Sequence, residues 1–310
     1  GTPNDAFGYQ ALYSNTTGGY NVSVGYQSLY ANTTGDSNVA IGTFAANALT
    51  TGNSNIAIGR GALLTATTAI QNVAVGRDAL RTNTASYNTA VGYAALPSNT
   101  TGTPNDAFGY QALYSNTTGS YNVAVGGQSL YSNTTGQYNV AVGWQALYNN
   151  TIGQLNTGLG DYAGGNLTTG SNNTLVGTNA GYNAVAITTG SGNLCLGTNA
   201  HTSTATASNQ IVLGFNGVGQ GDNYVSIGTG GTNYIYNQFT TNATWTKASD
   251  ERIKQNIQDL PIGLDFINEL KVKQYNWKPN NEYPTDIIGY SEENTQDTEA
   301  TMYGMIAQDV

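Results

Sequence analysis

Charged side chains are scarce over most of this 310-residue chain. Residues 1–248 carry six acidic and four basic side chains, whereas residues 249–310 carry twelve acidic and five basic ones. The formal net charge of the whole chain is -9, and the sequence contains no stripe of basic residues. The phosphates of a nucleic acid therefore find no complementary surface, and we expect no nucleic-acid partner.

Cysteine, histidine and long apolar runs are scarce as well. The single cysteine, Cys195, excludes an intrachain disulfide, and we expect it to be a buried free thiol. The single histidine, His201, reads as a surface or capping residue, and the sequence shows no metal-ligand constellation, so we expect neither a metal nor a cofactor. No apolar run is long enough to span a membrane, so we expect no membrane insertion. The chain begins without a signal peptide or an initiator methionine, and we expect it to be an internal segment.

A motif of the type Asn-Val-Ala-Val-Gly recurs through residues 1–230. Its closing glycine, called the anchor glycine below, recurs at a step of 17 residues in ten of thirteen intervals, and the other intervals are 16, 20 and 14 residues long. The anchor glycines are Gly8, Gly25, Gly42, Gly59, Gly76, Gly92, Gly109, Gly126, Gly143, Gly160, Gly177, Gly197, Gly214 and Gly228. A unit this short cannot bury a core alone, so the units must stack on one another. The period predicts an all-β parallel β-solenoid, or β-roll, with one repeat in each coil.

The residues before each anchor glycine read as a short strand that is apolar on both faces. A large apolar residue stands one place before every anchor glycine, as in Val125, and Val or Ile often stands three places before it, as in Val123. Alanine usually stands between them, as in Ala124. Alternate side chains of a strand point to opposite faces, so one face can line the core of the coil. We expect the alanine-lined face to be the other one, covered by further copies of the chain.

Asparagine stands four places before most anchor glycines. One hypothesis is that these amides bond from coil to coil as a ladder, and the alternative is that asparagine only begins a turn. Twelve successive asparagines favour the ladder, because turn positions usually vary among Asn, Asp, Gly and Ser. The twelve are Asn4, Asn21, Asn38, Asn55, Asn72, Asn88, Asn105, Asn122, Asn139, Asn156, Asn173 and Asn193. Gln210 and Tyr224 follow at the next two positions, where we expect the solenoid to end.

Three other positions of the repeat are regular. Leucine four places after the anchor glycine predicts a second core column. An Asn-Thr-Thr-Gly sequence, as at residues 116–119, predicts a tight corner at the glycine, although Asn-Thr-Thr is also a sequon for N-glycosylation. Tyrosines fill outward columns, where we expect the rings to stack on one another, the alternative being that they bind glycans or partner proteins.

The repeat resembles two families of fibrous proteins. It is similar to the heads of trimeric autotransporter adhesins, whose left-handed parallel β-rolls carry a comparable Val-Ala-Ile-Gly strand, and to the shaft repeats of phage tail fibres. The resemblance covers about residues 1–230 and implies a homotrimer. We therefore expect a repetitive shaft over residues 1–230, a neck over residues 231–248 and a separate domain over residues 249–310.

The third segment carries an ordered set of motifs. Ser-Asp-x-Arg-x-Lys begins at Ser249, a helical pattern covers residues 263–270, an alternating pattern predicts a strand over residues 272–277, and Gly-x-Ile-Ala-Gln-Asp-Val ends at Val310. Together they resemble the C-terminal intramolecular chaperone of phage tail fibres and endosialidase tailspikes. The resemblance implies a small α+β domain that helps three chains to trimerise. Because the family's domain continues further, we expect the chain to hold only its N-terminal part.

Many members of that family cut themselves off through a Ser–Lys dyad. Carried over to this sequence, the nucleophile is Ser249, its base is Lys254 and the scissile bond is Ala248–Ser249. A trimer interface can bury the lysine and lower its pKa until it accepts the serine proton. The alternative is that Ser249 or Asp250 caps a helix while Lys254 is a solvated charge. Any enzymatic activity is then at most a single self-cleavage.

Two functions fit the sequence best. The first is a trimeric fibre of a virus, such as a phage tail fibre, with a host-surface glycan or protein as receptor and other fibre or virion proteins as partners. The second is a bacterial cell-surface adhesin or extracellular filament, so both locations are extracellular. A glycan-degrading spike is disfavoured because the shaft holds six Asp and no Glu, at different positions in the repeat. Ice binding through the threonine columns is disfavoured because Ile152 and residues 66–69 interrupt them.

Overall fold

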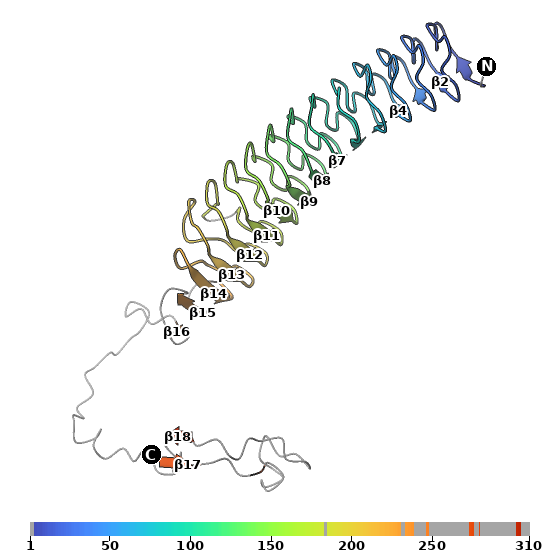
Figure 1. Ribbon diagram of the computed structural model, residues 1–310. Coiled ribbons are helices and arrows are strands. Elements are labelled where there is room, and N and C mark those ends of the chain that lie inside the picture. Colours follow the sequence, from blue (N-terminus) through green and yellow to red (C-terminus); the bar gives the residue numbers. More distant parts are fainter. Residues whose placement is uncertain are drawn as a thin grey trace. The chain divides into compact units, whose positions relative to one another are not determined.

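The computed structural model describes residues 3–182, 185–230, 233–238, 246–247, 273–275, 279 and 302–304. The chain divides into two compact units, Gly1–Ser249 and Asp250–Val310. In the first unit, successive coils stack into the rod that Figure 1 shows. In the second, β17 (Lys273–Tyr275) pairs antiparallel with β18 (Met302–Gly304), and β17 lies where the alternating pattern predicts a strand. The helix predicted over residues 263–270 lies outside the described residues.

Each coil contributes one short strand to a sheet that runs along the first unit. The strands are β1 (Asp5–Phe7), β2 (Val22–Val24), β3 (Val39–Ile41), β4 (Ile56–Ile58), β5 (Val73–Val75), β6 (Thr89–Val91), β7 (Asn105–Phe108), β8 (Asn122–Val125), β9 (Val140–Val142), β10 (Thr157–Leu159), β11 (Thr174–Val176), β12 (Leu194–Leu196), β13 (Ile211–Leu213) and β14 (Tyr224–Gly228). Each strand from β1 to β13 pairs in parallel with the next one, and each residue pairs with its counterpart in the next repeat. The predicted parallel β-solenoid is therefore confirmed.

The parallel order ends at β14. Strand β15 (Tyr234–Gln238) pairs antiparallel with β14, and β16 (Thr246–Lys247) pairs antiparallel with β15. Both strands lie in the stretch that was expected to be a neck. They cover the edge of the last coil, whose unpaired backbone groups would otherwise be open to pairing with another chain.

Two columns of side chains fill the narrow core of the coils. Ala124 and Ala141, two places before their anchor glycines, and Leu130 and Leu147, four places after them, are all fully buried. The leucines occupy the left-handed region of backbone space, with φ angles of 49° and 50°. That conformation disfavours an L residue by about 1–2 kcal/mol, whereas burying a leucine side chain contributes about 1.5–3 kcal/mol. Burial therefore offsets the strain in each coil.

Where the sequence departs from the repeat, a larger side chain in one core column is matched by smaller ones in the other. Leu175 stands in the alanine column, and Gly164 and Gly181 stand in the leucine column of the adjoining coils. A Cβ added at Gly164 would lie 2.6 Å from Leu175 Cδ1, and one added at Gly181 would lie 3.0 Å from Leu175 Cδ2. A large side chain in one column thus requires glycine in the other, as expected for a close-packed interior.

The expectation that the alanine-lined face meets other copies of the chain is wrong. The alanines lie inside their own coil, opposite leucines that leave room for only a small side chain. The large apolar residues on either side of each alanine point outward instead, so Val125 is 38% exposed and Val142 is 39% exposed. The sheet therefore presents valine and isoleucine, rather than alanine, to its surroundings.

The asparagine column bonds both along the stack and across each coil. Nδ2 of Asn122 donates to Oδ1 of Asn105 in the preceding coil, at 3.1 Å, and to the carbonyl oxygen of Gly136 at the corner of its own coil, at 2.9 Å. Oδ1 of Asn122 accepts the backbone N–H of Asn139 in the following coil, at 3.0 Å. Each amide thus fixes the separation of its neighbours as well as the closure of its own coil.

The bond from Oδ1 to the next backbone N–H recurs at every asparagine of the column from Asn4 to Asn193. At Gln210 the pattern changes, because its longer side chain bonds to the backbone N–H and the hydroxyl of Ser203. The amide ladder therefore ends one coil before the last parallel strand.

Replacing Asn122 with alanine should weaken the solenoid strongly. The substitution leaves the carbonyl of Gly136 and the N–H of Asn139 without their partners, and each stranded polar group costs about 1–3 kcal/mol. Guanidinium unfolding followed by circular dichroism measures the effect. Thr135→Ala is the matched control, because Thr135 is exposed and its hydroxyl has no hydrogen bond among the described residues. Equal unfolding midpoints for the two variants would contradict the role of the ladder.

Candidate functional site

The candidate dyad Ser249 and Lys254, together with the Ala248–Ser249 bond, lies outside the described residues. The surface on which the structure can place functional side chains is the outside of the coils. Because each position of the repeat recurs in successive coils, that surface consists of columns of equivalent residues.

Two outward columns of the sheet are mostly apolar, although polar residues interrupt the second of them at Asp5, Thr89, Asp106, Thr157 and Thr174. They stand one and three places before the anchor glycines and are called the apolar strip below. Its most exposed large apolar members between β3 and β14 are Ile41, Ile56, Phe108, Val125, Val142, Leu196 and Ile227. Soluble chains rarely leave a continuous apolar face of this length uncovered, so the strip is a candidate contact surface.

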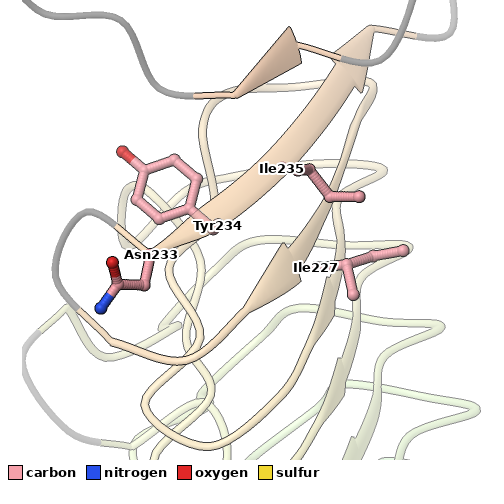
Figure 2. A pocket seen from close by; sticks show the side chains of 4 residues that line it. All are labelled: Ile227, Asn233, Tyr234 and Ile235. Atoms are coloured by element: carbon pink, nitrogen blue, oxygen red, sulfur yellow. The ribbon is translucent and has the colours of Figure 1, made fainter.

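The apolar strip continues past the last coil. Ile227 on β14 pairs in register with Ile235 on β15, and both side chains project to the same side of the sheet in Figure 2. Together with Asn233 and Tyr234 they line an open depression of about 270 Å³. None of these four lining residues is acidic or basic, so the depression presents an apolar contact surface and no acid–base pair.

The tyrosine columns are stacks. The rings of Tyr114, Tyr131 and Tyr148 lie 5.0 Å apart at each step and are parallel within 7°. Partial burial and the neighbouring tyrosines raise the pKa of Tyr131. Since the rings cover one another's faces, these faces are not free to stack on a sugar ring. The columns hold the coils together and present ring edges and hydroxyl groups to solvent.

A second asparagine column is buried at the Asn-Thr-Thr-Gly corners, and the sequence analysis missed it. Asn116 and Asn133 are fully buried. Nδ2 of Asn133 donates to Oδ1 of Asn116 at 2.8 Å and to the carbonyl oxygen of Gly136 at 3.1 Å. A glycan on either amide would break these bonds, so the folded coil excludes glycosylation at these sequons. The constant position of these asparagines in the repeat was a usable signal, as it was for the first column.

The second column also shows what happens when the pattern is interrupted. The column is interrupted twice, at Leu49 and Ala66 and again at Leu167 and Ile187. In the coils just before these two interruptions, Oδ1 of Asn32 and Oδ1 of Asn150 are buried without a hydrogen-bond partner. Each break therefore replaces a hydrogen bond with apolar burial and strands one carbonyl oxygen.

The threonine columns are tied to the backbone. Oγ1 of Thr134 donates to the carbonyl oxygen of Thr151 at 3.1 Å, and the equivalent threonines of neighbouring coils bond in the same way. One of the two adjacent columns therefore has its hydroxyl hydrogens engaged within the protein. This observation weighs further against an ice-binding array.

Charge and metal-ligand chemistry are sparse in the described part of the chain. The ion pairs found there join Arg77 and Arg81 to Asp78. No group of three or more His, Cys, Asp or Glu residues among the described ones is placed to hold a metal ion. His201 is half-buried, with its Nδ1 2.9 Å from the carbonyl oxygen of Thr202. The described residues also include no helix with the length and hydropathy needed to cross a membrane.

Comparison with known proteins finds a family match in the tail. Residues 249–310 match the family model described as the chaperone of endosialidase. No match was found among curated proteins or among solved structures. The tail is thus similar to the endosialidase-type chaperone, while the shaft is characterised by its parallel β-solenoid.

The thiol of Cys195 should be unreactive in the folded protein. The residue is fully buried in the alanine column, and burial raises its pKa to about 12. A raised pKa keeps the thiol protonated at every pH below that value, and the thiolate is the reactive form. Titration with a disulfide reagent at pH 8 should detect no thiol in the native protein and one thiol per chain in guanidinium. Rapid labelling of the native protein would contradict this burial.

Proposed function

We propose that the chain is part of a trimeric fibre. Three solenoid shafts pack side by side through their apolar strips, and the tail acts as the intramolecular chaperone that brings the three chains together. The observation that carries the proposal is the combination of an uncovered apolar face along the shaft with a tail that matches the chaperone of endosialidase. The number three rests on the two family resemblances, both of which are to trimeric proteins.

The shaft has a folding problem that a chaperone would solve. Parallel strands pair across a whole coil, so their contacts are non-local and slow to form. Residues 2–18 recur unchanged as residues 103–119, which makes coils interchangeable. A chain displaced by one coil against its neighbour would still pair most of its strip. Trimerisation at the tail sets the alignment of three chains before the coils close, and it limits the time for which strand edges are exposed.

The fibre serves attachment to a host surface, as the tail fibre of a bacteriophage does. A stiff stack of coils with no deep cleft among its described residues is suited to reach and display. Its receptor is a glycan or a protein of the host surface, and its other partners are virion proteins. The second candidate is a bacterial surface adhesin, which the resemblance of the shaft to adhesin heads favours. Both candidates place the protein outside the cell.

The tail also carries the candidate self-cleaving dyad. In this proposal the hydroxyl of Ser249 attacks the carbonyl carbon of Ala248, and Lys254, once the trimer has buried it, accepts the hydroxyl proton and returns it to the amine of Ser249 as the peptide bond breaks. Water then hydrolyses the resulting ester, which releases the chaperone from a shaft that has already assembled. Because burial depends on assembly, cleavage reports a completed trimer.

Light scattering after size exclusion tests the trimer. The full chain should give three times its mass of 32.4 kDa, or three shafts where the tail has been released. Val125→Glu combined with Val142→Glu should reduce the product to monomers, because the trimer would bury two carboxylates per chain in an apolar contact.

The matched control is Thr118→Glu combined with Thr135→Glu, which adds the same charge at exposed corners away from the apolar strip. This variant should remain trimeric. A monodisperse monomer from the unaltered chain, or equal dissociation of both double variants, would contradict the proposed packing.

Ser249→Ala should abolish release of the tail. Denaturing gels should show two fragments for the unaltered protein and one band for the variant. Lys254→Met should give the same single band, because the serine hydroxyl stays protonated without its base. If fragments persist in Ser249→Ala, another nucleophile performs the cleavage.

A further inference from the structure

Three of the four basic residues in residues 1–248 lie in two successive coils. Arg60 and Arg77 each stand one place after an anchor glycine, and Arg81 stands five places after one. Several other coils carry tyrosine at these positions, for example Tyr93 and Tyr114, whereas the coil just before Arg60 carries Thr43 and Asn47. The arginines therefore place charged side chains, at a single level of the shaft, in columns that elsewhere often hold stacking tyrosines.

The fold does not require arginine at these positions. The sequence duplication places Asp161 and Thr178 at the positions equivalent to Arg60 and Arg77, 101 residues further along. The same backbone hydrogen bond joins Arg60 and Asp161 to their next coils. The N–H of Asp78 donates to the carbonyl oxygen of Arg60 at 3.0 Å, and the N–H of Asn179 donates to that of Asp161 at 2.9 Å. The coil thus forms with an acidic or a hydroxyl side chain at these two positions, so folding does not require arginine at residues 60 and 77.

The arginines are arranged as a ladder along the shaft. Arg60 and Arg77 occupy adjacent coils, about 4.8 Å apart along the axis. The guanidinium of Arg77 lies over the ring of Tyr93, 5.6 Å from its centroid, and Tyr93 stacks in turn on Tyr110 at 5.5 Å. Stacking fixes the orientation of a guanidinium plane while leaving its N–H groups free to donate.

One carboxylate, that of Asp78, pairs with two of the three arginines. Oδ2 of Asp78 lies 3.2 Å from Nε of Arg77, and Oδ1 of Asp78 lies 3.9 Å from Nε of Arg81. Arg60 is exposed and has no acidic partner among the described residues. Three cations against one anion leave two positive charges on a shaft that is otherwise nearly uncharged.

The neighbouring column is also altered at this level. Two places after the anchor glycine, other coils carry glutamines whose amides bond to one another, as Gln27 does to Gln10 at 2.7 Å. Here the same column holds Gly61, Asp78 and Ala94. A Cβ added at Gly61 would lie 3.0 Å from Oδ1 of Asp78. The amide ladder is therefore interrupted beside the arginines, and shorter side chains take its place.

We propose that Arg60, Arg77 and Arg81 form a binding site for the carboxylate groups of an acidic polysaccharide. A guanidinium donates two parallel hydrogen bonds to a carboxylate, and two such groups in successive coils match a polymer with repeating charges. A neutral glycan would gain nothing from three cations. A nucleic acid requires many more phosphate contacts than two excess charges can supply.

The site rests on the proposed function, because it is a receptor site on the attachment fibre. In a trimer it occurs three times at one level of the shaft, so that a long polymer can engage several copies at once. The arginine column is separated from the apolar strip by the anchor glycine. Binding and assembly can therefore be measured separately.

Biolayer interferometry of the full chain on immobilised polygalacturonate tests the site, with neutral dextran and a DNA duplex as comparison surfaces. We expect binding to polygalacturonate that weakens with added salt, and little binding to the two comparison surfaces. Arg60→Gln combined with Arg77→Gln should raise the Kd at least about tenfold, because each arginine makes charge-assisted hydrogen bonds. Light scattering of the same samples should show unchanged trimers.

The matched control is Thr178→Asp. It makes the local charge more negative at the same coil position, six coils from Arg77, which is well beyond the screening length of about 8 Å at physiological salt. It should leave the Kd within about twofold.

Absence of binding by an intact trimer would overturn the site without contradicting the proposed fibre. An equal effect of Thr178→Asp, or tighter binding to the DNA duplex, would overturn it as well. Dissociation of the double arginine variant into monomers would assign the arginines to assembly instead.

Discussion

Hydrogen bonding of the backbone from coil to coil is the constraint on which the rest of the structure depends. It operates outside the strands as well as within them: the N–H of Leu130 donates to the carbonyl oxygen of Ala146, and that of Thr134 to that of Thr151. Each bond joins equivalent or nearly equivalent positions, so neighbouring coils must follow the same path. In the 20-residue interval the bonds from Gly181 and from Thr188 are kept, which places the three extra residues (20 − 17) between them.

The regularity that this constraint imposes made most of the fold readable from the sequence. A 17-residue period predicts stacked coils, and the leucine position predicts the core, because both recur in most of the coils. The second asparagine column was equally regular, but Asn-Thr-Thr-Gly also encodes a corner and a sequon. Because these two local interpretations explain the asparagine, the sequence did not indicate that Asn116 and Asn133 are buried. A motif with a familiar local meaning can thus conceal a position that the stacking makes structural.

The direction of the strand faces could not be read in the same way. Alternation separates Ala124 from Val123 and Val125, yet it does not say which set points inward. That choice depends on the volume available opposite, and leucines such as Leu130 from another part of the coil occupy it. Leu175 shows the converse case: where the inward strand residue is large, the facing positions are the glycines at 164 and 181. Pairing between distant columns, rather than the pattern of one strand, decides which residues are exposed.

Because the inward columns are fixed by closure and packing, only the outward columns are free to carry function. The two outward sets differ in a way that separates their roles. On the strand face, the column one place before the anchor glycines stays apolar in every coil, as a surface must if it is to meet identical copies along its whole length. The column after the anchor glycine changes from tyrosine to arginine to threonine or aspartate at particular levels, which a surface between identical copies would have no reason to do. Local variation on a uniform scaffold is what recognition of an external partner requires, and it is confined to positions where the coil does not constrain the side chain.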